Sequence, residues 1–338
     1  MSAQSLAAVA QAMVAPGKGI LAADESSGTI KKRFDSIGIE STAESRRAYR
    51  DMLFTTPGAG EFISGVILYD ETLRQSTLGG TPFPQYLAQQ GMLPGIKVDA
   101  GANALAGFPG ETITEGLDGL RERLKEYAAL GAKFAKWRAV IAIGPGFPGS
   151  FSLAANAHAL ARYAALCQEA GIVPIVEPEV LMDGDHDIAR CEDVTTAALE
   201  RTFLELRAHR VDFAGMVLKP NMVVPGASCK QKATVRDVAQ ATIRCLKATV
   251  PATVPGIAFL SGGQSPEEST EHLAVMNGLG ALPWQLTFSY GRALQGPSLK
   301  AWGGKPEGVK TGQAAFLKRA RLNGLAHGGK YRREMEVA

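Results

Sequence analysis

Short apolar segments recur along the chain, and most are followed by a turn and then by a stretch with helical spacing of apolar residues. Each segment is short and bounded by polar or turn-forming residues, which is typical of a buried strand. The eight segments are "GILAAD" (19–24), "GVILYDE" (65–71), "GIKVD" (95–99), "FAKWRAVI" (134–141), "VPIVEPEV" (173–180), "GMVLKP" (215–220), "GIAFLSGG" (256–263) and "LTFSYGR" (286–292).

The stretches between these segments predict amphipathic helices. Residues 114–131 predict a helix with Thr114 as its cap and Gly131 as its end, because leucines recur on one helical face. The same pattern recurs in residues 152–171 and 193–210. The N-terminal "LAAVAQAMVA" has no basic segment before it, so we predict a helix there rather than a signal peptide.

The alternation of strand and helix predicts βαβ units and a parallel sheet. Eight such units without a linker or low-complexity segment predict a closed (β/α)8 TIM barrel, an α/β fold in which residues 1–338 form a single domain. A doubly wound open sheet is the alternative, because sequence alone does not show closure. We expect residues 332–338 to be a short C-terminal tail.

Composition narrows the class of protein. Apolar residues make up 46% of the 338 residues and charged residues 20%, which is enough for a sizeable core and argues against disorder. A net charge of +3 is too small to indicate a protein that binds nucleic acid. The sequence contains no run of 18 apolar residues, so we expect no membrane-spanning helix. Four cysteines without metal-finger spacing indicate a reducing compartment.

Polar or glycine residues end nearly every predicted strand. Catalytic groups of TIM barrels lie at the carboxyl ends of the strands, so these residues predict a polar mouth. One such residue alone is more often an ordinary strand-end charge, and the ring of them is what favours a site. The residues are Asp24, Asp70, Glu71, Lys97, Asp99, Lys136, Arg138, Glu177, Glu179, Lys219, Ser261, Gly262, Gly263, Ser289, Gly291 and Arg292.

Lys219 directly follows an apolar strand and precedes Pro220, which favours an extended conformation and ends the segment. A surface lysine with a buried stem is the simpler reading of one such residue. At a barrel mouth, however, an amine kept neutral by burial or by a neighbouring cation such as Lys136 can form a Schiff base with a carbonyl. Glu177 could then move protons as the carbinolamine forms and loses water.

Two glycine-containing loops follow the seventh and eighth strands, at the positions where TIM barrels frequently bind phosphate. They are "LSGGQS" (260–265) and "FSYGRAL" (288–294), to which Arg292 and Lys97 would add charged contacts. "GPGFPG" (144–149) formally matches a dinucleotide-binding motif, but its prolines favour a rigid loop. "DGDHD" (183–187) could gather metal ligands, but the histidines are scattered along the chain and a capped helix start is favoured.

The motifs together resemble those of class I fructose-1,6-bisphosphate aldolases of the animal and plant form. The motifs are "GKGILAADES", "GIKVD", "FAKWR", "IVPIVEPEVL", "DGDHD", "LKPNMV", "FLSGGQS", "LTFSYGRAL" and "KAWGGK", in order from about residue 17 to 331. The resemblance implies a TIM barrel without metal or other cofactor, usually a homotetramer. It also implies a cytoplasmic role in glycolysis and gluconeogenesis, with reversible cleavage of fructose 1,6-bisphosphate to dihydroxyacetone phosphate and glyceraldehyde 3-phosphate.

The resemblance also implies roles for individual residues. Lys219 resembles the Schiff-base lysine, Glu177 the acid and base of dehydration and cleavage, Lys136 the lysine that assists carbinolamine chemistry, and Asp24 the carboxylate near the substrate C4 hydroxyl. Arg138 and Glu179 resemble supporting residues of the same mouth. The expected phosphate- and substrate-binding residues are Ser261, Gly262, Ser289, Gly291 and Arg292 at one end and Ser26, Thr29, Lys97 and Arg292 at the other.

One departure from the family pattern concerns the end of the sequence, "GKYRREMEVA". Animal enzymes of the family carry a longer mobile tail that closes with a tyrosine, whereas Tyr331 matches a tyrosine well before that tail. We therefore expect Tyr331 to lie in a docked segment and the protonation of the enamine to use water or a mouth residue. Another Schiff-base barrel aldolase and a non-catalytic binding scaffold are the alternatives to the aldolase assignment.

Overall fold

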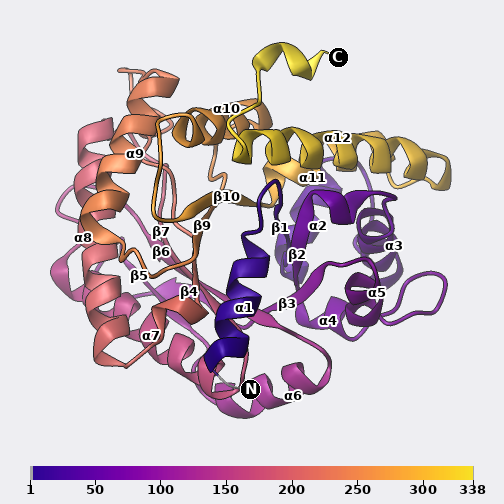
Figure 1. Cartoon of the computed structure of the whole chain (residues 1–338), viewed down its shortest axis with the longest axis horizontal. Helices are drawn as coiled ribbons and strands as arrows, with labels where there is room; N and C mark the ends of the chain where they lie inside the picture. The colour runs from indigo at the N-terminus through magenta and orange to yellow at the C-terminus, as the bar shows by residue number, and fades with distance from the viewer. Residues whose placement is uncertain (1–2, 338) are drawn as a thin grey trace.

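The computed structural model describes residues 3–337, and within them eight parallel strands close into a barrel (Figure 1). The order around the barrel is β1-β10-β9-β8-β7-β6-β3-β2, so the TIM-barrel prediction is confirmed and the open sheet is excluded. Residues 1, 2 and 338 of the predicted domain lie outside the described part. The barrel strands are β1 (Gly19–Ala23), β2 (Ile63–Leu68), β3 (Leu93–Lys97), β6 (Phe134–Ile141), β7 (Val173–Val180), β8 (Val217–Leu218), β9 (Gly256–Phe259) and β10 (Gln285–Tyr290).

Helices surround the barrel, and a small antiparallel hairpin of β4 (Gly101–Ala104) and β5 (Thr112–Glu115) follows β3 (Figure 1). The predicted helices 152–171 and 193–210 are confirmed as α7 and α8, and the N-terminal helix as α1. The helices are α1 (Ala3–Met13), α2 (Ser27–Asp35), α3 (Ala43–Phe54), α4 (Asp70–Leu73), α5 (Phe83–Gln89), α6 (Leu120–Ala129), α7 (Ser150–Glu169), α8 (Ile188–Ala208), α9 (Val235–Thr249), α10 (Pro266–Asn277), α11 (Arg292–Trp302) and α12 (Val309–His327).

The predicted helix over residues 114–131 begins too early. Thr114 lies in β5, where its hydroxyl donates a hydrogen bond to the carbonyl of Arg138 at 2.8 Å. Gly116 and Gly119 then take positive φ angles of 124° and 65°, which break the chain out of the strand and start α6 at Leu120. The leucine spacing correctly identified the helix, but the Thr cap was wrong because the hairpin competes for that segment.

The interior of the barrel is closed at its amino-terminal end by α1. Leu6, Ala10 and Met13 of this helix belong to one buried apolar cluster with barrel residues such as Ile67 and Phe134. Figure 1 shows α1 lying across the strands, and the Ser64 hydroxyl at the start of β2 donates to the Met13 carbonyl at 2.6 Å. With one end plugged, only the carboxyl ends of the strands are left to open into a mouth.

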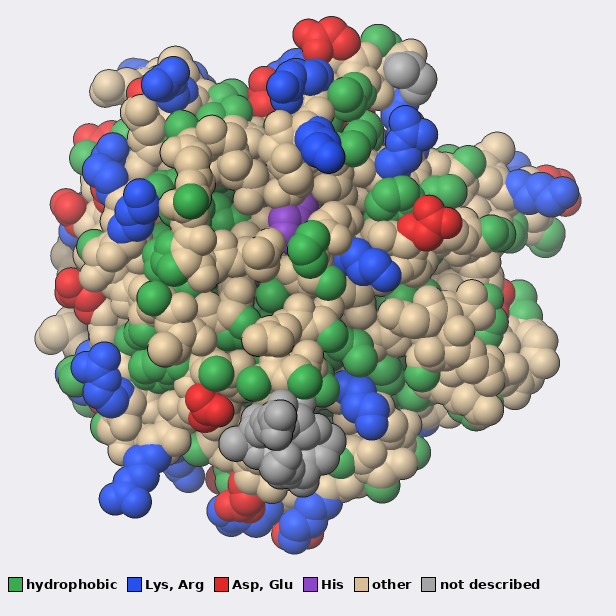
Figure 2. Space-filling model, viewed as in Figure 1, with side chains coloured by type: hydrophobic (Ala, Val, Ile, Leu, Met, Phe, Trp, Pro, Cys, Tyr) green, Lys and Arg blue, Asp and Glu red, His purple; other side chains and the backbone are tan. Residues whose placement is uncertain are grey.

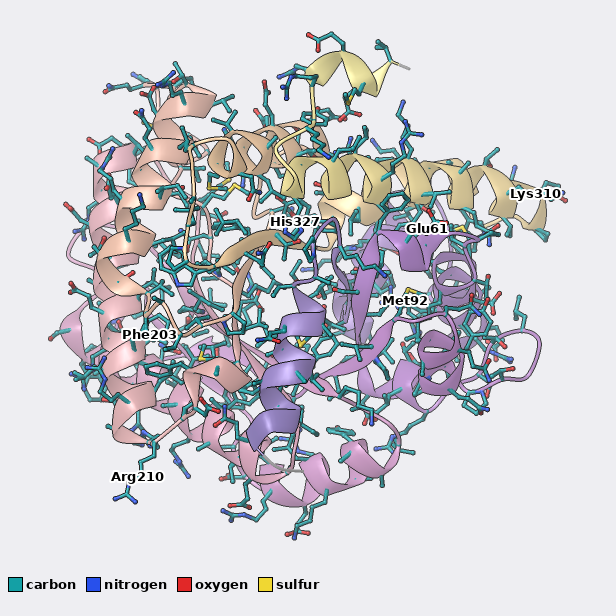
Figure 3. All side chains as sticks on the ribbon, in the orientation of Figure 1. Glu61, Met92, Phe203, Arg210, Lys310 and His327 are labelled. Carbon is teal, nitrogen blue, oxygen red and sulfur yellow. The ribbon has the colours of Figure 1, made fainter. Side chains whose placement is uncertain are left out.

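The second and larger apolar layer lies between the barrel and the helices. Phe203 of α8 is buried in this layer, whereas Arg210, just beyond the end of α8, projects away from the molecule (Figure 3). At the C-terminal end, Tyr331 is buried and donates a hydrogen bond to Glu336, which also pairs with Arg319 of α12. The segment around Tyr331 is therefore docked, as expected from the sequence.

On the face in Figure 2, acidic and basic side chains are both spread around the edge, with small apolar side chains between them. Among residues 3–337, no helix combines the length and apolar character needed to cross a membrane.

The close packing inside the barrel predicts a specific cost for a single methyl group. A Cβ at Gly95 would lie 2.2 Å from a ring carbon of Phe134, so Gly95→Ala should lower the free energy of unfolding by about 1–3 kcal/mol. Urea unfolding of Gly95→Ala, Phe134→Leu and the double variant forms a double-mutant cycle. The double variant should be more stable than the sum of the single losses predicts, and strict additivity would contradict this packing.

Candidate active site

A polar cavity of about 630 Å³ opens at the carboxyl ends of the barrel strands. All of the residues that the sequence assigned to catalysis or substrate binding line it: Asp24, Ser26, Thr29, Lys97, Lys136, Arg138, Glu177, Glu179, Lys219, Ser261, Gly262, Ser289, Gly291 and Arg292. Gly263 was expected in the same ring and does not line it. Asp70 and Glu71 were also expected there and do not line it either. They lie in α4, where Asp70 pairs with Arg74 and Glu71 with Arg46.

Two buried lysines share one glutamate at the bottom of this cavity. One carboxylate oxygen of Glu177 lies 3.0 Å from Nζ of Lys219, and the other lies 3.3 Å from Nζ of Lys136. Asp24, which directly follows β1 across the barrel, lies 2.7 Å from Nζ of Lys136. Strand alternation explains the arrangement, because side chains two residues apart point to the same side and Lys136 and Glu177 lie on neighbouring strands.

The charges of Asp24 and Lys136 stabilise one another. Burial alone would raise the pKa of Asp24, but the ammonium groups of Lys136 and Lys219 outweigh it and hold this pKa well below its usual range. Burial alone would lower the pKa of Lys136, but the carboxylates of Asp24, Glu177 and Asp99 outweigh it and raise this pKa well above its usual range. Asp24 is therefore a poor base at neutral pH, and Lys136 is a fixed cation.

Lys219 has a different environment from Lys136. Lys136 faces three carboxylates within 4.0 Å, whereas the one ion pair of Lys219 among the described residues is with Glu177, which it shares. Its backbone N–H donates to the Val176 carbonyl at 2.8 Å, which fixes Lys219 at the end of β8 just before Pro220. Lys219 is thus the lysine with less counter-charge, and the fixed cation of Lys136 stands on the other side of their shared glutamate.

Two further ion pairs complete this side of the mouth. Arg138 of β6 binds Glu179 of β7, and burial opposed by that carboxylate leaves the pKa of Arg138 raised above its usual range. Lys97 lies 2.7 Å from Asp99, whose second oxygen accepts a hydrogen bond from the backbone N–H of Arg138. Asp99, which the sequence placed in the ring without a role, therefore links the end of β3 to the middle of β6.

One end of the cavity is built from two loops that Arg292 joins. Its guanidinium donates a hydrogen bond to the Gly262 carbonyl at 2.5 Å, linking the loop after β9 to the start of α11. Gly262 has a φ of 57°, a conformation that favours glycine. The Ser289 hydroxyl is buried and has no hydrogen-bond partner among residues 3–337, so a polar group of a bound molecule would satisfy it. Backbone N–H groups and a cation here suit an anion.

The other end of the cavity is built around the start of α2. The hydroxyls of Ser26 and Thr29 lie 3.2 Å apart, and Lys97 lines the same cavity. Lys32 and Arg33 also line the cavity, although they were not predicted from the sequence. Their spacing of three and four residues from Thr29 on a helix was the signal that could have found them.

A buried ion network behind this end was also missed. Glu25 is buried between the guanidinium groups of Arg33 and Arg50, and Gln295 donates to it at 2.8 Å. Burial would raise the pKa of Glu25, but the two arginines outweigh it and lower it below its usual range. The network fixes the residue between Asp24 and Ser26, although no sequence spacing links Glu25 to Arg50 or Gln295.

The two motifs for which the sequence favoured a loop and a helix start, "GPGFPG" and "DGDHD", have these local structures in the fold. "GPGFPG" forms the loop before α7, with a cis peptide bond between Phe147 and Pro148. In "DGDHD", Asp187 caps α8 by accepting a hydrogen bond from the Arg190 N–H at 2.8 Å. The histidines are scattered along the sequence, but folding brings His158 and His209 together, with their ring centroids 4.9 Å apart.

A closed barrel with two buried lysines, a shared glutamate and a cationic glycine loop at its mouth is typical of enzymes that use an amine to act on a carbonyl compound. The family model described as "Fructose-bisphosphate aldolase class-I" matches residues 5–338. The chain belongs to this family, and with it to the carbon–carbon lyases of glycolysis.

Individual relatives are similar over nearly the whole chain. "Probable fructose-bisphosphate aldolase class 1" of Xanthomonas campestris pv. campestris is 58% identical, with 98% of this chain and 100% of the relative covered. "Fructose-bisphosphate aldolase 4, cytosolic" of Arabidopsis thaliana is 54% identical over 95% of this chain and 82% of its own length. A crystal structure of fructose-bisphosphate aldolase from Plasmodium falciparum, in complex with TRAP and a small-molecule inhibitor, superposes with a TM-score of 0.96 at 50% identity and covers 97% of this chain and 95% of that chain.

The loop after β9 is supported by a histidine, which gives a pH prediction. His272 of α10 lies 2.6 Å from the side-chain oxygen of Gln264, whose amide also donates to the Ser261 carbonyl. Burial lowers the pKa of His272 to about 4. Between this value and the ordinary pKa near 6.5 the unfolded chain binds a proton that the folded chain does not, so stability falls as pH falls through that window.

We therefore expect His272→Asn to lose less stability than the parent between pH 7 and pH 4. The difference should reach up to about 3 kcal/mol, the free energy of keeping one histidine neutral across that window. Urea midpoints of both proteins at several pH values measure it. Parallel pH profiles for the two proteins would show that His272 does not contribute to acid sensitivity.

Proposed function

We propose that this chain cleaves fructose 1,6-bisphosphate reversibly to dihydroxyacetone phosphate and glyceraldehyde 3-phosphate through a Schiff base on Lys219. The reaction is that of its family, and the observation that carries the residue assignment is the buried set of Lys219, Glu177, Lys136 and Asp24. Lys219 is the lysine with less counter-charge, so it is the better candidate for the neutral amine that attacks the C2 carbonyl.

The position of Glu177 suits it to the proton transfers. Attack of Nζ on C2 gives a carbinolamine, and its hydroxyl must gain a proton to leave as water and form the iminium. Glu177 lies within 3.3 Å of both lysine nitrogens, so it can first accept a proton from the Lys219 ammonium, which leaves the neutral amine, and later deliver that proton to the carbinolamine hydroxyl. The fixed cation of Lys136 would stabilise negative charge that develops on the departing oxygen.

Cleavage between C3 and C4 then requires removal of the proton from the C4 hydroxyl. The bonding electrons move into the iminium, which becomes an enamine, while C4 leaves as the aldehyde. Asp24 is held as a weakly basic carboxylate, so its proposed part is to accept a hydrogen bond and orient that hydroxyl. Glu177, which has given up its proton during dehydration, is the proposed base for the C4 hydroxyl.

The two ends of the cavity match a substrate with two phosphates. Ser261, Gly262, Gly291 and Arg292 are the proposed ligands of one phosphate, with Ser289 near the sugar. Ser26, Thr29 and Lys97 are the proposed ligands of the other, and Lys32 and Arg33 add positive charge beside them. Arg138 and Glu179 are proposed to support the mouth between the two ends.

The location and assembly of the protein are proposed from the family. Two plant relatives carry the names "cytosolic" and "cytoplasmic isozyme", which supports a cytoplasmic enzyme. A homotetramer is the assembly that the family resemblance implies, and sedimentation equilibrium would measure its mass. A chain that sediments as a monomer at the working concentration would overturn that part of the proposal.

Borohydride trapping tests the assignment of Lys219. With dihydroxyacetone phosphate present, reduction should attach the substrate to Lys219, and Lys219→Met should abolish both trapping and cleavage while the fold remains. Lys136→Met is the matched control, because it removes a neighbouring buried lysine and leaves the nucleophile in place. Mass mapping that finds the label on Lys136 or another lysine would refute the assignment.

The second phosphate site predicts a difference between two substrates. Lys97→Ala should lower kcat/KM for fructose 1,6-bisphosphate by about 10- to 100-fold, the effect of losing one charge-assisted hydrogen bond. Fructose 1-phosphate is the internal control, since it lacks the second phosphate and should be affected much less. Equal losses for the two sugars would remove Lys97 from phosphate binding and leave it a role in ordering Asp99.

A further inference from the structure

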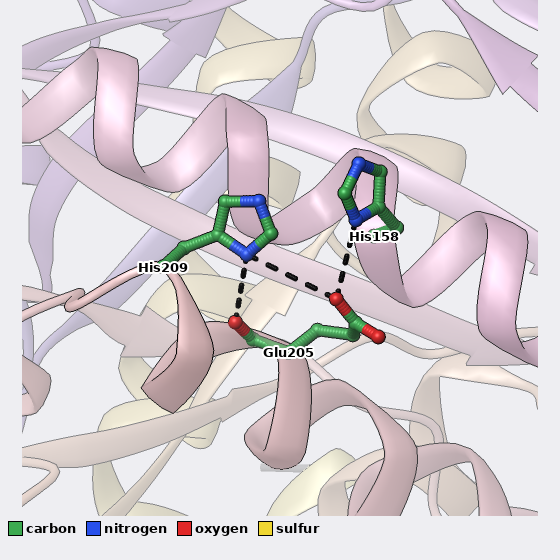
Figure 4. A group of neighbouring side chains, drawn as sticks. All are labelled: His158, Glu205 and His209. Atoms are coloured by element: carbon green, nitrogen blue, oxygen red, sulfur yellow. Dashed lines mark hydrogen bonds and ion pairs between the residues drawn. The ribbon is translucent and has the colours of Figure 1, made fainter.

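Two histidines and a glutamate meet on the outside of the helix ring, at a place that the catalytic mechanism does not use. His158 lies on α7, and Glu205 and His209 lie one turn apart at the carboxyl end of α8 (Figure 4). One possible ligand atom of each side chain lies within 4.8 Å of the other two. The three residues are absent from the lining of the active-site cavity.

We propose that His158, Glu205 and His209 form a binding site for a divalent transition metal, with zinc as the ion that fits the donors best. Zinc is bound by imidazole nitrogens and carboxylate oxygens, and two histidines with one glutamate are a familiar set of protein ligands for it. Magnesium and calcium prefer oxygen ligands and would not select this cluster.

The distances in the cluster approach those of a coordinated ion. Oε2 of Glu205 lies 3.2 Å from Nδ1 of His158 and 3.9 Å from Nδ1 of His209. Two atoms that each lie about 2.0–2.1 Å from one zinc ion in tetrahedral geometry are about 3.4 Å apart. Small side-chain rotations therefore suffice, without any movement of the helices.

Neighbouring groups hold the ligands in place. The other oxygen of Glu205 pairs with Arg201 one turn earlier in α8 at 2.7 Å, which leaves Oε2 facing the two imidazoles. Nδ1 of His209 donates a hydrogen bond to the Glu205 carbonyl at 2.9 Å, so ligation through this nitrogen would break that hydrogen bond and place the ring proton on Nε2. The ring centroids of the two histidines are 4.9 Å apart.

The exposure of the cluster allows an ion to enter. The side chain of His158 is 51% exposed, whereas those of His209 and Glu205 are 23% and 14% exposed. A zinc ion on these three ligands keeps a position for water on the exposed side. The ion would join α7 to α8, and its free energy of binding to the folded chain would add to stability.

If the cluster binds zinc without taking part in catalysis, zinc should raise the stability of the chain and leave its activity unchanged. The chain is treated with EDTA, dialysed and titrated with ZnCl2 by calorimetry and by thermal unfolding. We expect about one zinc per chain and a melting temperature that rises by several degrees at saturation. MgCl2 should produce no rise, and cleavage of fructose 1,6-bisphosphate should be equal with and without zinc.

Substitutions identify the ligands. His158→Gln and Glu205→Gln should each weaken zinc binding at least 10-fold, with the zinc-free melting temperature as the check that each variant folds. His186→Gln is the matched control, because this histidine lies in "DGDHD", the other metal candidate, and has both ring nitrogens unpaired among the described residues. Its zinc affinity should equal that of the parent chain.

X-ray absorption at the zinc edge of the unmodified chain gives a second readout that does not depend on any variant. Nitrogen and oxygen ligands at about 2.0–2.2 Å support the proposal, whereas sulfur at about 2.3 Å would place the ion on cysteines and overturn it. Undiminished zinc affinity in His158→Gln, loss in His186→Gln, or cleavage that requires zinc would overturn it as well.

Discussion

The ammonium group of Lys136 is the charge around which the barrel mouth is organised. It is buried, and three carboxylates lie within 4.0 Å of it. Asp24 follows β1, which is not a neighbour of β6 in the barrel, so the contact between Asp24 and Lys136 crosses the interior and exists only when the sheet is closed. A buried charge that loses its partner is costly, so closure of the barrel and pairing of these charges depend on one another.

The same pairing gives different electrostatic environments to two lysines that look equivalent in the sequence. Lys136 receives enough negative charge to remain an ammonium, whereas Lys219 shares one glutamate with it. Glu177 stands between a fixed cation and a candidate nucleophile, which is where a group that carries protons to and from a carbinolamine has to stand. Asp24 is held as an anion by the same lysines and so is better suited to orienting a hydroxyl than to removing its proton.

The sequence predicted the features that depend on local pattern. Eight apolar segments identified the eight strands of the barrel. Parallel strands present their carboxyl ends on one side, which correctly predicted that Lys97, Lys136, Glu177 and Lys219 line one cavity. The same rule failed for Asp70, because it begins α4 directly after β2 and pairs with Arg74 outside the cavity. Contacts between distant segments were not predictable. Glu25 contacts Arg50 and Gln295 because three distant segments pack together, and no sequence pattern predicts these contacts.

The carboxylate cluster at the mouth already contains a cation between its oxygens, whereas the cluster of His158, Glu205 and His209 on the outer surface does not. At the mouth, the space between Asp24, Glu177 and Asp99 holds the Lys136 ammonium, and a metal ion would have to displace that cation against strong Coulomb attraction. At the outer surface, the arginine beside Glu205 binds one oxygen and leaves the other facing two imidazoles. Because the mouth already holds the fixed cation of Lys136, an amine that forms an iminium can supply the electrophile there. A metal ion bound between α7 and α8 would instead stabilise the fold without entering the reaction.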